Sequence, residues 1–257
     1  MSNILYAKDK STSYENFIAW CPYCGYKNIY NRITDLKTNE AIGFRRVKCL
    51  SNDCGKDFNI NGDSINSAFQ MLVFDCYDLK QEKKYSYCIL NLTQAFEVFF
   101  SFYLRVELLY KPFGIEYKEE KYNLDYMNEL SKQLYEKIKP YTFIKLRGIF
   151  LNQVLKNQPV RSLNEAGEII QNLNSSISTP TDAMIGCIKD TYLSELLMNL
   201  KNTKICELRN KVVHKLAYRP SLEEVEKAIE ETRGILFPLA SRLEMKTDDI
   251  NWYMSHS

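Results

Sequence analysis

One short segment of this chain, "CELRNKVVHKL" at residues 206–216, combines an arginine, an asparagine and one of the two histidines. Histidine is the side chain whose ordinary pKa suits proton transfer near neutral pH, so His214 is a candidate general acid or base. Arg209 carries a permanent charge on a planar fork that fits phosphate. Asn210 can orient a phosphate or the imidazole by hydrogen bonding. The spacing therefore predicts that these three residues form a catalytic set.

Helical periodicity predicts where these side chains lie. Three later apolar residues share a stripe with Ile205: Leu208, Val212 and Leu216. At about 100° per residue, His214 falls about 180° away from Ile205, and Asn210 lies on nearly the same face as His214. We therefore expect His214 to face away from the core of its own chain. The alternative is an exposed histidine on a solvated helix face with no catalytic role.

Four of the eight cysteines lie in two motifs, "WCPYCGYKN" with Cys21 and Cys24, and "KCLSNDCGKDF" with Cys49 and Cys54. Four thiolates fit tetrahedral Zn²⁺ and leave no open position, which predicts a structural metal site. We expect the intervening stretch to form a hairpin that joins the two pairs, as in a zinc ribbon. The alternatives are two disulfides or four unrelated thiols. The other four cysteines are expected to be small buried residues: Cys76, Cys88, Cys187 and Cys206.

Basic and aromatic residues surround the cysteine motifs. The basic ones are Arg45, Arg46, Lys48 and Lys56, and the aromatic ones are Tyr23, Tyr26, Phe44 and Phe58. Such a combination can hold phosphates and stack bases, so these basic residues are candidates for binding nucleic acid. The alternative is a solvated hairpin face over the ribbon's own small core.

Composition divides the chain into two parts, a zinc ribbon at residues 1–62 and a helical domain at 63–257. Glycine and proline are scarce, at 9 and 7 residues, which favours a mainly α fold with a small β part at the start. The net charge of +2 neither requires nor excludes a nucleic-acid partner. We expect no secretory signal and no membrane segment, and hence a reducing cytoplasmic location in which cysteine clusters bind metal.

Apolar residues at spacings of three and four predict the helices. They are expected at residues 64–79, 86–110, 123–139, 141–156, 163–172, 181–215 with a break, and 221–245. The last has the clearest start, because Ser221 and Glu224 have the spacing of a capping box. Its buried face is predicted to contain Leu222, Val225, Ile229, Leu236 and Leu243.

At this point the sequence resembles the HEPN family, named for higher eukaryotes and prokaryotes nucleotide-binding. The residues that carry the resemblance are "ELRNKVVHK", followed by the helix "SLEEVEKAIEETRGIL". Upstream, "LTQAFEVFFSFYLRVELL" looks like the long early helix of that family, with its acidic residue at Glu97. The resemblance covers residues of roughly 65–245, and its last 45 or so carry the specific part. It implies a HEPN-like helical bundle.

The resemblance also implies an activity. The family's ribonucleases cut RNA without metal, through attack of the ribose 2′-hydroxyl, at a site that two subunits share. It implies that Arg209, Asn210 and His214 are catalytic, that Glu97 supports the site, and that the protein is a homodimeric endoribonuclease acting as a toxin or antiviral defence effector. An antitoxin or other regulatory protein is a further expected partner. Family toxins regulated by a nucleotidyltransferase antitoxin often carry a tyrosine where this chain has Leu216, which argues against that mode of regulation.

Two other functions fit the same residues. One is a non-catalytic module in which the ribbon binds nucleic acid or protein while the helical domain dimerises. The other is a zinc-ribbon transcription regulator that binds DNA. Cleavage of RNA separates the enzyme from both.

Overall fold

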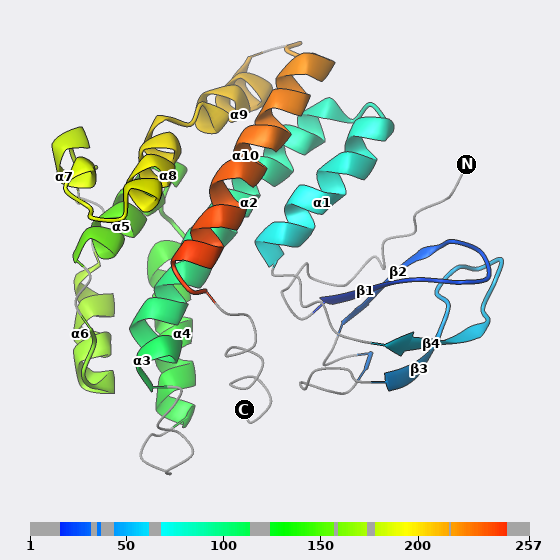
Figure 1. Ribbon diagram of the computed structural model, residues 1–257, viewed down its shortest axis with the longest axis horizontal. Helices are drawn as coiled ribbons and strands as arrows, with labels where there is room; N and C mark the ends of the chain where they lie inside the picture. Colours follow the sequence, from blue (N-terminus) through cyan, green and yellow to red (C-terminus); the bar gives the residue numbers. More distant parts are fainter. Residues whose placement is uncertain are drawn as a thin grey trace.

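The computed structural model describes residues 16–31, 35–36, 44–61, 68–113, 124–156, 159–173, 178–215 and 217–245. Within them the fold is mainly helical, with two small hairpins near the N-terminus, as the composition predicts (Figure 1). The predicted boundary between residues 62 and 63 and the second histidine, His256, lie outside the described residues.

The β part consists of two separate antiparallel hairpins. Strand β1 (Asn16–Trp20) pairs with β2 (Lys27–Asn31), and β3 (Phe44–Lys48) pairs with β4 (Asp57–Asn61). Each cysteine pair lies at the turn of its own hairpin. The prediction that the stretch between the pairs forms the hairpin was therefore wrong. The cysteine turns themselves reverse the chain.

A small apolar core lies between the two hairpins. Its members include Ala19, Tyr30, Val47, Phe58 and Ile60. Phe58 is thus a core residue and not a free stacking surface, and Tyr26 packs against the same cluster. This outcome agrees with the alternative in which some of these aromatic residues form the ribbon's own core.

Two polar side chains tie the hairpins together. The fully buried Asn28 on β2 donates to the carbonyls of Ala19 (3.2 Å) and Tyr26 (3.0 Å) and accepts from the amide of Leu50 (2.7 Å). The hydroxyl of Tyr30 donates to the carbonyl of Lys48 at 2.8 Å. A buried amide with all these partners holds one register, so the two cysteine turns have a fixed relation.

The helical part starts at α1 (Ala68–Gln81), which packs along α2 (Tyr85–Arg105). The later helices are α4 (Leu124–Ile138), α5 (Phe143–Lys156), α6 (Leu163–Asn172), α7 (Asp182–Gly186), α8 (Thr191–Asn202), α9 (Ile205–His214) and α10 (Leu222–Arg242). The expected break within 181–215 is confirmed, since α7, α8 and α9 are separate helices. Figure 1 shows α2 between α1 and the later helices, with α10 crossing in front of it.

The core of the helical part is aromatic and centres on α2. Phe69 and Phe99 meet edge to face with ring centroids 5.1 Å apart, and Tyr103 contacts Phe150 at 4.7 Å. These side chains are all buried, which confirms that the apolar run around Glu97 forms a buried helix. The α-helix ends at Arg105 and continues as a π-helical turn, Val106–Tyr110, and a short helix α3, Lys111–Phe113.

Helix α10 begins as its sequence predicts. The Ser221 hydroxyl accepts from the amide of Glu224 at 3.1 Å, and the Glu224 carboxylate accepts from the amide of Ser221 at 2.8 Å. Val225, Ile229, Leu236 and Leu243 are buried, but Leu222 is 45% exposed, so its predicted burial was wrong. Side chains lean towards the N-terminus of their helix, and the first residue of α10 therefore projects past the packed face.

The prediction for the four remaining cysteines was partly right. Cys76 and Cys88 are fully buried between α1 and α2, whereas Cys206 is half-buried and Cys187 is exposed. Cys187 follows directly after the short helix α7, where no neighbouring helix covers it. Among the described residues, none of the helices has both the length and the apolar content needed to cross a membrane.

The hairpins contact the helical part through one polar cluster. Lys27 on β2 lies 3.4 Å from the carboxylate of Asp78 on α1, and both side chains are largely buried. Asp75, one turn earlier on α1, is buried, and its Oδ1 has no hydrogen-bond partner within the described chain. Burial raises the pKa of Asp75 to about 6. The negative charge of Asp78 adds to this rise, and the positive charge of Lys27 opposes it. Charge at Asp75 is therefore costly in the folded chain.

Candidate metal centre and arginine–histidine site

The four predicted cysteine ligands meet at one point. The sulfurs of Cys21, Cys24, Cys49 and Cys54 all lie within 4.8 Å of one another. The Cys21 and Cys54 sulfurs are 3.8 Å apart, and those of Cys24 and Cys49 are 3.7 Å apart. A tetrahedron with metal–sulfur bonds of about 2.3 Å has edges of about 3.8 Å. The cluster thus has the dimensions of a tetrahedral four-thiolate metal site.

Both cysteine turns close in the same way. The amide of Cys21 donates to the carbonyl of Tyr26 at 2.9 Å, and that of Cys49 donates to Lys56 at 2.9 Å. Gly25 and Gly55, each directly after a ligand, have φ of +70° and +56°, a conformation that glycine adopts without strain. The two turns are therefore equivalent despite their different lengths.

The second turn is longer than the first but has the same backbone geometry, because its first cysteine lies two residues earlier in the chain. The Gly25 amide donates to the carbonyl of Cys21, and the Gly55 amide donates to that of Ser51. Ser51 thus occupies the place in the second turn that Cys21 has in the first. Cys49, two residues earlier, supplies the sulfur, which explains the four-residue spacing.

Backbone amides favour thiolate at this cluster. Burial opposes ionisation of Cys21, but the amides of Tyr23 and Cys24 and the neighbouring thiols outweigh it and lower its pKa to about 7. Burial raises the pKa of Cys49. Four thiolates this close repel one another strongly, and a divalent cation removes that repulsion. The donor set therefore fits a metal ion that binds sulfur.

The arginine–histidine motif forms helix α9, as predicted. Ile205 is buried, Leu208 and Val212 pack against the core, and His214 is exposed at the last residue of the helix. The geometric prediction that His214 faces away from its own core is confirmed for the described residues. The fourth member of the apolar stripe, Leu216, lies outside them.

The structure brings two of the three motif residues together. The Arg209 Nη1 donates to the Asn210 Oδ1 at 3.2 Å. Asn210 is exposed and Arg209 is half-buried. His214 makes no hydrogen bond to either residue, and it has no other hydrogen bond or ion pair to a described residue. Its imidazole is therefore free to contact a ligand.

Glu97, the acidic residue of α2 that the sequence singled out, interacts electrostatically with Arg209. Helices α2 and α9 pack together, and the negative charge of the half-buried Glu97 carboxylate interacts with the positive charge of Arg209. Burial raises the pKa of Glu97, and Arg209 opposes that rise. The two side chains therefore attract each other across the contact between α2 and α9.

Two further residues at this site were not predicted. Cys206, one turn before Arg209, interacts electrostatically with Arg147 on α5 as well as with Arg209 and Glu97. The guanidinium of Arg147 lies 5.7 Å from the Phe143 ring centre and makes one long bond, 3.5 Å, to the carbonyl of Leu200. Its Nε is buried without a partner among the described residues. No motif in the sequence links Arg147 to α9, 60 residues away, so only the packing of the helices shows it.

The predicted basic residues of the ribbon lie in different surroundings. Arg46 pairs with Asp57 at 3.2 Å, and Arg45 is half-buried. Lys48 and Lys56 are exposed, and the Lys56 ammonium lies 5.0 Å from the centre of the Tyr23 ring. Lys48 and Lys56 are therefore the two that remain open to a ligand at the cysteine turns.

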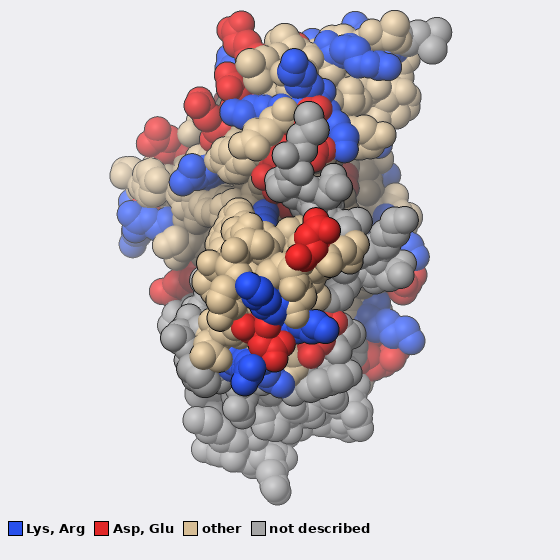
Figure 2. Space-filling model, turned by 90° about the vertical axis from the view of Figure 1, so that its right-hand side faces the viewer, with Lys and Arg blue, Asp and Glu red and all other residues tan. Residues whose placement is uncertain are grey.

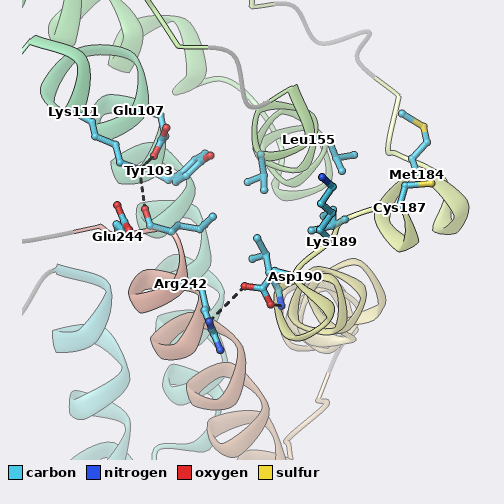
Figure 3. A pocket seen from close by; sticks show the side chains of 14 residues that line it. Tyr103, Glu107, Lys111, Leu155, Met184, Cys187, Lys189, Asp190, Arg242 and Glu244 are labelled. Atoms are coloured by element: carbon cyan, nitrogen blue, oxygen red, sulfur yellow. Dashed lines mark hydrogen bonds and ion pairs between the residues drawn. The ribbon is translucent and has the colours of Figure 1, made fainter.

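A cavity of about 520 Å³ lies elsewhere, between the end of α2, α5, α8 and the end of α10 (Figure 3). Its charged side chains largely neutralise one another. Lys111 lies 2.7 Å from Glu107, and Arg242 lies 3.5 Å from Asp190, which also caps α8. None of the predicted site residues lines this cavity. The arginine–histidine site is instead an open surface.

A scan against protein-family models, a search of curated proteins and a search of solved structures found no match to this chain.

Proposed function

We propose that this protein is a metal-independent endoribonuclease of the HEPN type. The observation that carries the proposal is the arrangement on α9, where an exposed histidine follows an arginine that donates to an asparagine and interacts electrostatically with a half-buried carboxylate. The capped helix α10 directly after this motif supports the resemblance.

The side chains can divide the reaction between them. Cleavage requires a base that takes the proton of the ribose 2′-hydroxyl as its oxygen attacks phosphorus. It also requires an acid that protonates the 5′-oxygen as its bond to phosphorus breaks. The products carry a 2′,3′-cyclic phosphate and a 5′-hydroxyl. His214 has the chemistry for either proton transfer, and Arg209 stabilises the charge that develops on the phosphate oxygens.

Arg147 on α5 and Glu97 on α2 support this arrangement from the helices that lie behind α9 in the fold. Glu97 keeps Arg209 oriented through its opposite charge. Arg147 places a second guanidinium near the same helix, with a donor that has no described partner. The positive charge of this guanidinium adds to the attraction for a phosphate of the RNA near α9.

The site is proposed to be complete only in a homodimer. One cleavage event uses both an acid and a base, and α9 supplies a single histidine. Val213, beside His214, is 47% exposed, so the end of α9 offers an apolar contact as well as the imidazole. A two-fold axis at this surface brings two copies of His214 into one cleft. Light scattering tests this arrangement, and a fully active monomer contradicts it.

For the cysteine cluster we propose Zn²⁺ with a structural role. Zinc binds four thiolates in tetrahedral geometry and leaves no position for a substrate. A reducing cytoplasm, the location we propose, keeps such thiols available to metal. In the biological setting that the family resemblance implies, the enzyme is a toxin or antiviral effector restrained by a regulatory protein.

The decisive experiment compares cleavage of labelled RNA by the wild type, Arg209→Ala and His214→Ala in the presence of EDTA. We expect 2′,3′-cyclic phosphate ends from the wild type, and a loss of about 10²–10⁴-fold in rate for His214→Ala. Lys204→Ala is the matched control, because Lys204 is an exposed cation at the start of the same helix. Intact RNA with the wild type, or unchanged cleavage by His214→Ala, rejects the enzyme.

The second candidate function is a non-catalytic binding module. The observation that favours it is the exposed aromatic surface of the ribbon, which has a use whether or not α9 is catalytic. In that case RNA is bound and stays intact.

A further inference from the structure

Three large apolar side chains on the ribbon are exposed, and each is next to a metal ligand or between two. Trp20 precedes Cys21 and is 65% exposed, Tyr23 lies between Cys21 and Cys24 and is 60% exposed, and Leu50 follows Cys49 and is 40% exposed. Because the four sulfurs lie within 4.8 Å of one another, these three residues adjoin the same cysteine cluster. We call this surface, with Lys48 and Lys56, the knuckle face.

The ribbon's core does not require these side chains. Along β1 the buried residue is Ala19 and the exposed one is the much larger Trp20. The buried side of the ribbon is filled by residues such as Tyr30, Val47 and Phe58. Exposed aromatic side chains that cluster at one end of a small domain are typical of a binding surface.

The knuckle face carries two positive charges, and the exposed Asp53 in the second cysteine turn places one negative charge near them. Lys56 lies 5.0 Å from the Tyr23 ring centre, and Lys48 Cε passes 3.6 Å from where a β-carbon on Gly55 would lie. Neither lysine forms an ion pair with a described residue, in contrast to Arg46, which pairs with Asp57. Figure 2, which faces the side where Figure 1 shows the hairpins, has uncharged surface beside basic and acidic side chains. Lys56 and the Tyr23 ring are direct neighbours, and Lys48 passes close to the second cysteine turn.

We infer that the knuckle face binds single-stranded RNA, with bases stacked on Trp20 and Tyr23 and phosphates held by Lys48 and Lys56. Aromatic rings beside lysines bind unpaired nucleotides, because every base offers a flat face and every linkage a negative charge. A duplex hides its base faces. The buried Asn28, which bonds to backbone atoms beside both cysteine turns, holds the backbone of the two turns in a fixed relation before RNA arrives. The inference rests on the proposed function in one respect, the choice of RNA as the polymer that is bound.

The test measures binding by the full zinc-loaded chain carrying His214→Ala, so that cleavage cannot remove the probe. Fluorescence anisotropy with a labelled single-stranded RNA gives the dissociation constant, and the matching RNA duplex and single-stranded DNA are measured in parallel. We expect Trp20→Ala and Tyr23→Ala each to weaken binding about tenfold. Lys48→Ala and Lys56→Ala are expected to weaken it and to reduce its dependence on salt.

The matched control is Tyr87→Ala on α2, because Tyr87 is 61% exposed and lies outside the ribbon. It is expected to leave binding unchanged. Zinc content of each variant confirms that the ribbon is intact. Unchanged binding by Trp20→Ala and Tyr23→Ala overturns the inference, as does equal affinity for the duplex, and tighter binding of single-stranded DNA than of RNA overturns RNA as the ligand. The inference is also overturned if these variants lose self-association but still bind RNA.

The outcomes separate this inference from the proposed function. If the wild type cleaves RNA and His214→Ala does not, but the ring variants bind RNA normally, the enzyme stands and the knuckle face does not. If no protein cleaves RNA but the ring variants lose binding, the knuckle face stands and the enzyme does not.

Discussion

The ribbon and the helical part differ in what holds them together. Among its described residues the ribbon buries eight apolar side chains, two of which are the candidate metal ligands Cys21 and Cys49. The helical part has an extended core of packed aromatic rings around α2. A metal site can replace a large core in a small domain, because metal binding adds its free energy directly to folding. The two parts therefore depend on different interactions for their stability.

This difference affects where each part can carry function. In the ribbon, the cysteine turns that could hold a metal ion leave Trp20 and Tyr23 outside the core, where both side chains are exposed. In the helical part, α9 contributes Ile205 to the buried core and leaves His214 outside. Each candidate surface is thus made of side chains that the local core does not use. Changes in either core are expected to act on stability, and changes in either surface on ligands.

The largest effect is expected from loss of the metal. Metal removal, or Cys21→Ser, should unfold the ribbon, because structural zinc contributes on the order of 10 kcal/mol to such domains. The helices should keep their far-ultraviolet circular dichroism signal, since their aromatic core contains no metal ligand. Hydrogen exchange resolved along the sequence measures the two parts separately.

Cys187→Ser is the control for that experiment, because Cys187 is exposed and lies far from the ligands in sequence. It should change neither metal content nor exchange. Simultaneous loss of protection in α2 and the ribbon would contradict the comparison, since it would make the two parts one cooperative unit.

A smaller effect is expected where the two parts meet. The pKa of Asp75 is raised by burial to about 6, so the folded chain binds more protons there than the unfolded chain between about pH 4 and 6. Stability at this residue therefore falls as pH rises through that window. Asp75→Asn removes the buried charge and should stabilise the protein at pH 7.5 by up to about 3 kcal/mol, with no gain at pH 4. Denaturant unfolding at both pH values measures it.

Asp78→Asn offers a comparison of opposite sign. Asp78 pairs with Lys27 at 3.4 Å, so its neutralisation leaves a largely buried lysine without that partner and should destabilise the protein. Equal effects of Asp75→Asn and Asp78→Asn would show that the two carboxylates are not in different environments.

Local spacing was enough to predict some elements. Cysteine spacing predicted the four-sulfur cluster, and the Ser221–Glu224 spacing predicted the start of α10. Helical periodicity predicted the exposure of His214. Each of these patterns involves residues that are close in sequence or of a distinctive type. The structural feature can therefore be predicted without knowing how the helices and strands pack.

Other features depend on packing between distant segments. Arg147 meets Cys206 only because α5 and α9 each pack on α2, and Lys27 meets Asp78 across 51 residues. The two strands that flank each cysteine turn pair with each other, and not with the strands of the other turn. The reason is that backbone hydrogen bonds within each turn reverse the chain there. The burial of Leu222 was predicted wrongly because periodicity does not say where a neighbouring helix ends.

The smallest effect is expected at the start of α10, and it measures how much local capping adds to a helix that a large core already holds. Ser221→Ala removes the hydrogen bond to the Glu224 amide and should cost about 1 kcal/mol in unfolding free energy. Ser162→Ala on α6 removes the same kind of bond, to the Glu165 amide at 3.1 Å, but the Glu165 carboxylate accepts from Arg161 and not from the cap residue. The amide of residue 221 still donates to the Glu224 carboxylate in Ser221→Ala, so each variant loses one side-chain bond, and losses of similar size are expected with metal content unchanged. A clearly larger loss for Ser221→Ala would mean that the side-chain bond also keeps the reciprocal bond in place.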